Sequence, residues 1–99
     1  MKPQIAEALG ILQEECAEVI VEVSKIRRFG LDTADYNANM ERTHRASLTN
    51  EVGDVLAMIG VLIEQKILDP DALELAHNRK IEKLKVWSKI FTDPDKKDN

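Results

Sequence analysis

The sequence predicts an all-α protein: a small bundle of three main helices with a possible short additional helix, completed by oligomerisation. Composition is the first reason, because four Gly, three Pro and four aromatic residues among 99 give few signals for turns or strands. The second reason is that apolar residues recur at helical spacing in three segments. The length suits one domain, which we expect over 1–91, with a polar, disordered tail over 92–99.

The first helix is expected from about Pro3 to Phe29. Pro3 suits a first helical turn, and Gly30 after two arginines suits a helix end. Cys16 falls within the apolar stripe, so we interpret it as a small core residue. The whole stripe comprises Ile5, Leu9, Leu12, Cys16, Val19, Ile20, Val23 and Ile26.

The second helix is expected to begin between Met40 and Leu48, with Thr43 or Ser47 as its cap, and to end near Lys66. Gly53 within it costs about 1 kcal/mol of helix propensity relative to Ala, which close approach of a helix or ligand would justify. The polar connection before this helix, within 30–47, is long, and it suits either a lid over a ligand site or a simple connector.

The third helix is expected from Pro70 or Asp71 to Phe91, with Asp69 as its cap. Its apolar face comprises Leu73, His77, Ile81, Leu84 and Phe91. Three such helices are too few to cover their own apolar faces, which predicts a homodimer or homotetramer.

The overall charge and the single cysteine exclude several classes of protein. A net charge of −4 argues against nucleic-acid binding, which depends on clustered Lys and Arg. With Cys16 alone, neither an intramolecular disulfide nor a site with several thiolates forms within one chain, and a reducing, cytoplasmic location fits best. Acidic residues interrupt the first apolar segment, so we expect neither a signal peptide nor a membrane span.

Two pairs of acidic residues border the apolar stripes of the first two helices. Glu15 and Glu18 lie one turn apart on the first helix, and Glu51 and Asp54 bear the same relation to the second. Packing of the two helices would bring these four like charges together, which is unfavourable without a cation. Carboxylates are the ligands that Mg²⁺ and Mn²⁺ prefer, so the pairs predict a site for Mg²⁺, with Mn²⁺ as a substitute.

The segments Glu14-Glu15-Cys16-Ala17-Glu18 and Glu51-Val52-Gly53-Asp54 resemble the EExxE and ExxD motifs of the MazG-like, all-α nucleoside triphosphate pyrophosphohydrolases. The resemblance covers most of the chain and is nearest to the small phage and bacterial type. It implies hydrolysis of a nucleoside triphosphate between the α and β phosphates, to the monophosphate and pyrophosphate. It also implies that Glu15, Glu18, Glu51 and Asp54 bind Mg²⁺ and carry the catalysis, with the water-activating carboxylate unassigned.

One departure from the family pattern concerns the spacing, because 32 residues separate Glu18 from Glu51, more than is usual in the family. This affects the region expected to recognise the base more than it affects the metal site. The family usually binds phosphates through the helix after ExxD, which favours Lys80 and then Asn78 as substrate-binding residues. Lys25, near the acidic edge of the first helix, and Met58, one turn after Asp54, are further candidates. The groups available to stack on a base are Trp87, Tyr36 and Phe29.

Two Glu-x-x-His segments support a rival interpretation. Glu41 with His44, and Glu74 with His77, have the spacing that di-iron carboxylate bundles use on two of their helices. That arrangement does not explain the paired acids, and a histidine within an apolar stripe is more commonly a core residue. A helical interaction module without enzymatic activity is the third alternative.

Overall fold

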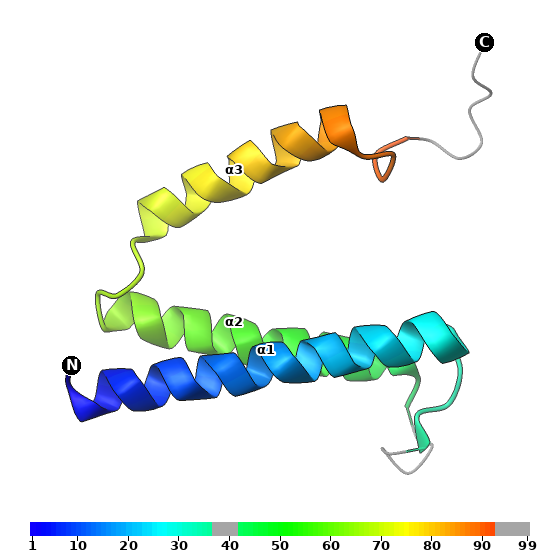
Figure 1. Ribbon diagram of the computed structural model, residues 1–99, viewed down its shortest axis with the longest axis horizontal. Helices are drawn as coiled ribbons and strands as arrows, with labels where there is room; N and C mark the ends of the chain where they lie inside the picture. Colours follow the sequence, from blue (N-terminus) through cyan, green and yellow to red (C-terminus); the bar gives the residue numbers. More distant parts are fainter. Residues whose placement is uncertain (37–41, 93–99) are drawn as a thin grey trace. The chain divides into compact units, whose positions relative to one another are not determined.

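The computed structural model describes residues 1–36 and 42–92. Within these residues the chain forms three α-helices and no strand: α1 (Pro3–Phe29), α2 (His44–Glu64) and α3 (Pro70–Trp87) (Figure 1). The predicted all-helical class is therefore confirmed. The chain divides into two compact units, Met1–Ile67 and Leu68–Asn99. The predicted disordered tail lies, apart from Thr92, outside the described residues, and the predicted single domain stays a prediction.

The first unit is a helical hairpin in which α1 and α2 lie side by side and run in opposite directions (Figure 1). Pro3 begins α1, and Gly30 ends it with a positive φ of 95°, a conformation that glycine adopts without strain. Thr43 caps α2, because its Oγ1 accepts a hydrogen bond from the backbone N–H of Ala46 at 3.2 Å. Of the two predicted caps for α2, the structure uses Thr43.

The buried face of α1 agrees only in part with the predicted stripe, of which Ile5, Leu12, Val19 and Ile26 are half-buried. Ala8 and Glu22 are buried and Glu15 is half-buried, at seven-residue spacing along the helix. Leu9 and Ile20 are exposed instead, and so is Cys16, so the prediction of Cys16 as a core residue is wrong. The physical reason is that the apolar stripe of α1 is wider than the surface that one partner helix covers.

The connection between α1 and α2 is fixed to the start of α2 by backbone hydrogen bonds. The N–H groups of His44 and Arg45 donate to the carbonyl oxygens of Thr33 and Leu31, at 3.1 and 2.8 Å. The guanidinium of Arg45 also holds the carboxylate of Asp32 through two hydrogen bonds of 2.9 Å. As a result, the described part of the connection lies against the end of the hairpin and brings its side chains to the two helices.

In the second unit, α3 begins as predicted but ends earlier. The side chain of Asp69 accepts a hydrogen bond from the N–H of Asp71 at 3.0 Å, and Pro70 occupies the first turn. The helix ends at Trp87 and not at Phe91, because Ser88 has an extended backbone, with φ −131° and ψ 156°. The predicted extent of this helix was therefore four residues too long.

Among the described residues, one helix, α2, has the length and apolar composition needed to cross a membrane. Core helices of soluble proteins also meet these two criteria, so the finding is weak evidence for a membrane span. Three acidic residues lie within this helix: Glu51, Asp54 and, at its end, Glu64. The absence of a membrane partner and the cytoplasmic location stay predictions.

Candidate metal centre

Three of the four predicted metal ligands lie together between α1 and α2. Each of Glu15, Glu51 and Asp54 offers a carboxylate oxygen, and these oxygens all lie within 4.8 Å of one another. Glu15 and Glu51 are half-buried, whereas Asp54 is exposed. Glu15 comes from the middle of α1. Glu51 and Asp54 lie one turn apart on one edge of α2, as their spacing predicted.

Glu18, the fourth predicted ligand, is exposed and lies one turn further along α1. Glu18 does not belong to the group of carboxylates whose oxygens lie within 4.8 Å of one another. Its negative charge nevertheless raises the pKa values of Glu15 and Glu51. Glu18 is therefore close enough to interact electrostatically with Glu15 and Glu51.

The surroundings of Glu15 and Glu51 favour their neutral forms. Partial burial is the largest effect that raises the pKa of Glu15, followed by the negative charge of Asp54. The pKa of Glu51 is raised in the same way, by burial first and then by the charge of Asp54. Glu18 raises the pKa of both carboxyls further. Because a carboxylate bound to a cation must be ionised, a divalent ion would remove the unfavourable energy that these shifts express.

This group of acids suits a hard divalent cation. Its ligand atoms are all carboxylate oxygens, and Mg²⁺ typically binds one or two carboxylates while keeping water or phosphate oxygens in its remaining positions. One edge of the group is exposed at Asp54 and Glu18, which leaves room for such ligands. The residues present therefore fit the predicted Mg²⁺, although they do not distinguish it from Mn²⁺.

A cavity of about 560 Å³ lies at the end of the hairpin that carries the connection. Two basic residues, Lys25 and Arg28, line it together with aromatic side chains. The rings of Phe29 and His44 stack with their centroids 5.8 Å apart. The complete lining comprises Lys25, Arg28, Phe29, Thr33, Ala34, Asp35, Tyr36 and His44.

The predicted substrate-binding residues have different locations. Lys25 lines the cavity, and its ammonium group lies 3.3 Å from Oε1 of Glu22. Met58 is half-buried on α2 and is not among the residues that line the cavity. Asn78 and Lys80 are exposed on α3, in the second unit. Their part in substrate binding stays a prediction.

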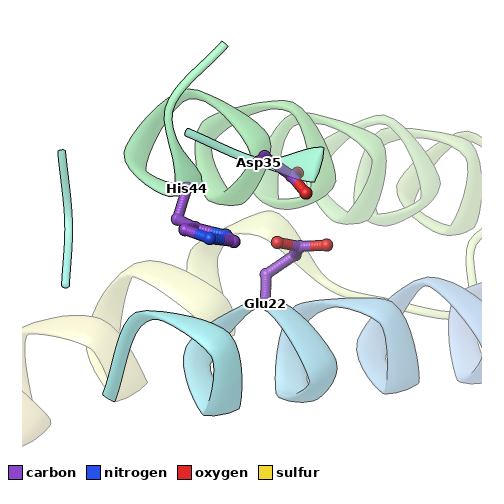
Figure 2. Close-up of side chains that lie close together, drawn as sticks. All are labelled: Glu22, Asp35 and His44. Atoms are coloured by element: carbon purple, nitrogen blue, oxygen red, sulfur yellow. The ribbon is translucent and has the colours of Figure 1, made fainter. Parts of the chain in front are cut away.

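Sequence reasoning did not find a second group of possible metal ligands. Glu22, Asp35 and His44 are buried, and each offers a ligand atom within 4.8 Å of the others (Figure 2). Glu22 follows Glu18 by one turn on the same edge of α1, which was the available signal. Asp35 joins this group only because the connection folds back toward the two helices. The spacing of residues in the sequence does not indicate this fold.

The di-iron interpretation receives no new evidence from the positions of its residues. His44 lies beside Glu22 and Asp35, whereas Glu41 is outside the described residues. Glu74 and His77 are both exposed on α3. That interpretation therefore stays an untested alternative.

No protein-family model, curated protein or solved structure matches this chain. The candidate sites therefore depend on the residues and geometry of this chain alone.

Proposed function

We propose that the protein is a Mg²⁺-dependent nucleoside triphosphate pyrophosphohydrolase of the MazG-like type, which cleaves the bond between the α and β phosphates. The observation that carries the proposal is the convergence of Glu15, Glu51 and Asp54, from two motifs far apart in the sequence, within 4.8 Å. The raised pKa values of Glu15 and Glu51 support the proposal, because burial and neighbouring negative charges disfavour their ionised forms and a bound cation would favour them. A metal-bound triphosphate is a ligand that makes use of such a group.

In this proposal Glu15, Glu51 and Asp54 hold Mg²⁺, with Glu18 as a further ligand directly or through water. The ion would neutralise the triphosphate and polarise the α-phosphoryl group. The carboxylates orient the attacking water through hydrogen bonds. One of these carboxylates would also accept the proton of the water, and the proposal leaves open which of them does so.

In this proposal the cavity receives the nucleoside and part of the phosphate chain. Glu18, Glu22, Lys25 and Phe29 follow one another at spacings of three and four residues, so they share one face of α1. At 1.5 Å per residue, Lys25 lies about 10 Å along the helix from Glu18. The cations of Lys25 and Arg28 would contact phosphate oxygens, and the rings of Phe29 and Tyr36 would contact the base.

We also propose that the protein acts as a homodimer or homotetramer. Large apolar side chains on the hairpin are exposed, among them Ile20, which is 68% exposed on α1, and Leu56, which is 61% exposed on α2. Leu9, Val23 and Val52 are exposed as well. An apolar surface of this kind is typical of helices that pack against a second subunit.

The proposal is tested by incubating the purified protein with Mg²⁺ and a panel of ribo- and deoxyribonucleoside triphosphates. We expect release of pyrophosphate and the monophosphate, without orthophosphate. The Glu51→Gln variant should abolish this release, because the amide keeps the shape of the side chain but removes its charge. Glu14→Gln is the matched control, because Glu14 is an exposed acid next to Glu15 and lies outside the group of ligand atoms.

Two results would contradict the proposed activity. One is the absence of turnover for every nucleotide in the presence of Mg²⁺ or Mn²⁺. The other is iron in the protein as purified, with visible absorption, which would favour the di-iron alternative. A purely structural role for the acids is also distinguishable, because Glu15→Gln and Asp54→Asn would then stabilise the fold and change nothing else.

A further inference from the structure

The second group of ionisable side chains comes from three different parts of the hairpin. Glu22 projects from α1, His44 is the first residue of α2, and Asp35 belongs to the connection between them. Figure 2 shows the carboxylate of Glu22 and the ring of His44 pointing toward one another, with the carboxylate of Asp35 beside them. The exposed fractions are only 6% for Glu22, 3% for Asp35 and 5% for His44. This group is therefore a buried site, not a solvated acidic surface.

Among the described residues, two of these side chains, Glu22 and His44, have a buried polar atom without a hydrogen-bond partner. Oε1 of Glu22 accepts from the ammonium of Lys25, but within the described residues Oε2 of Glu22 has no hydrogen-bond partner. Nδ1 of His44 is likewise buried and unpartnered within the described chain. An unsatisfied buried polar group costs about 1–3 kcal/mol, and more when it is charged. A ligand bound by both Glu22 and His44 would offset part of this cost.

The ion pair of Glu22 leaves its second carboxylate oxygen without a hydrogen-bond partner among the described residues. The cation of Lys25 contacts Glu22 from its own helix, one turn away, through the other carboxylate oxygen. The ammonium of Lys25 therefore does not take the place of a ligand at Oε2 of Glu22.

We propose that Glu22, Asp35 and His44 bind a divalent first-row transition-metal ion, with Zn²⁺ as the representative, at a site separate from the four acids of the proposed Mg²⁺ centre. Two carboxylates balance the charge of a divalent ion. An imidazole nitrogen favours Zn²⁺ and related ions over Mg²⁺. Metal–ligand bonds of about 2.0–2.2 Å place ligand atoms about 3–4 Å apart, so small movements of the side chains complete the site.

The position of this site indicates what the ion would do. The ion would join α1, the connection and the start of α2, so it would hold the connection against the hairpin. Asp35 and His44 also line the cavity, so a fourth ligand of the ion can come from there. Three protein ligands with one open position is the arrangement of Zn²⁺ sites that bind water or a small anionic ligand.

The experiment uses the full chain, first treated with a chelator and then titrated with Zn²⁺ in a large excess of Mg²⁺, which occupies the four-acid centre. Calorimetry should show one Zn²⁺ bound per chain. The chain contains only two histidines, so NMR of the imidazole nitrogens distinguishes them. We expect the resonances of His44 to shift on binding and those of the exposed His77 to stay unchanged.

Variants make the test specific to these residues. His44→Gln and Glu22→Gln should each weaken Zn²⁺ binding at least about tenfold. His77→Gln is the matched control and should bind as the wild type does. If His44→Gln does not fold, the NMR titration of the wild type still decides the question. The proposal is overturned by the absence of Zn²⁺ binding, by equal binding in the folded variants, or by unmoved His44 resonances at saturation.

Discussion

The two groups of ionisable side chains between α1 and α2 lie on neighbouring turns of one hairpin but differ in burial and composition. The four-acid group contains only carboxylates, is partly exposed and carries several like charges. The group of Glu22, Asp35 and His44 is buried, includes a nitrogen ligand, and has the cation of Lys25 against one of its carboxylates. The first therefore suits a hard ion that shares its shell with water and phosphate, and the second suits an ion held mainly by protein atoms.

The largest expected effect separates the two groups by activity. Loss of a ligand from the four-acid group removes charge stabilisation worth several kcal/mol in the transition state, so Glu51→Gln should lower kcat/KM at least about 100-fold. Glu22→Gln removes a carboxylate one turn away from Glu18 and should lower kcat/KM less. Steady-state measurement of pyrophosphate release compares the two variants. An equal loss in both would mean that the groups act as one site.

The next effect concerns how the buried group is held together. The hydroxyl of Ser47 donates a hydrogen bond to Oδ2 of Asp35, and both residues are buried. Ser47→Ala should lower the free energy of unfolding by about 1–3 kcal/mol, because a buried carboxylate loses a donor. Chemical denaturation measures this difference. The matched control is Thr49→Ala, which removes an exposed hydroxyl from α2 and should change stability much less. A loss as large in the control would show that burial of the bond is not the cause.

The pH dependence of stability distinguishes the half-buried acids from other carboxylates. The pKa values of Glu15 and Glu51 are raised from 4.5, so the folded state binds their protons more tightly than the unfolded state. Without divalent ions, their contribution to stability is therefore greatest below pH 4.5 and is lost as the pH rises through the raised values. Asp32 acts in the opposite direction, because Arg45 lowers its pKa from 3.8. The contribution of Glu15 to the pH dependence of stability is therefore isolated by comparing the wild type with a variant that lacks this carboxyl.

That comparison uses Glu15→Gln in thermal denaturation at several pH values. Without metal, the variant should be more stable than the wild type at pH 7 and lose this advantage near pH 4. Added Mg²⁺ should stabilise the wild type increasingly as the pH rises, because binding requires ionised carboxylates. A constant difference between the two proteins across this range would contradict the raised pKa of Glu15.

The sequence predicted the three helices and the approach of Glu15, Glu51 and Asp54 more accurately than the buried face of α1 and the group of Glu22, Asp35 and His44. Helical spacing and caps such as Thr43 are local, and the ExxE and ExxD positions repeat one angular relation on two helices. The rotation of α1 that exposes Cys16 depends on which part of a wide stripe its partner covers. The approach of Asp35 to Glu22 and His44 depends on how the connection folds back, which follows from tertiary contacts and not from any periodic pattern.

The smallest expected effect concerns Gly53, within the second acidic motif. A Cβ atom at Gly53 meets nothing within 4 Å, and the same holds at Gly60 on the same helix. On helix propensity alone, Ala at either position should therefore stabilise the isolated hairpin by about 1 kcal/mol. If the proposed substrate or a second subunit approaches the backbone at Gly53, Gly53→Ala should also lower activity or weaken self-association, whereas Gly60→Ala should not. Denaturation, pyrophosphate release and sedimentation of both variants separate these effects. Equal behaviour in all three measurements would mean that Gly53 has no role beyond its cost to the helix.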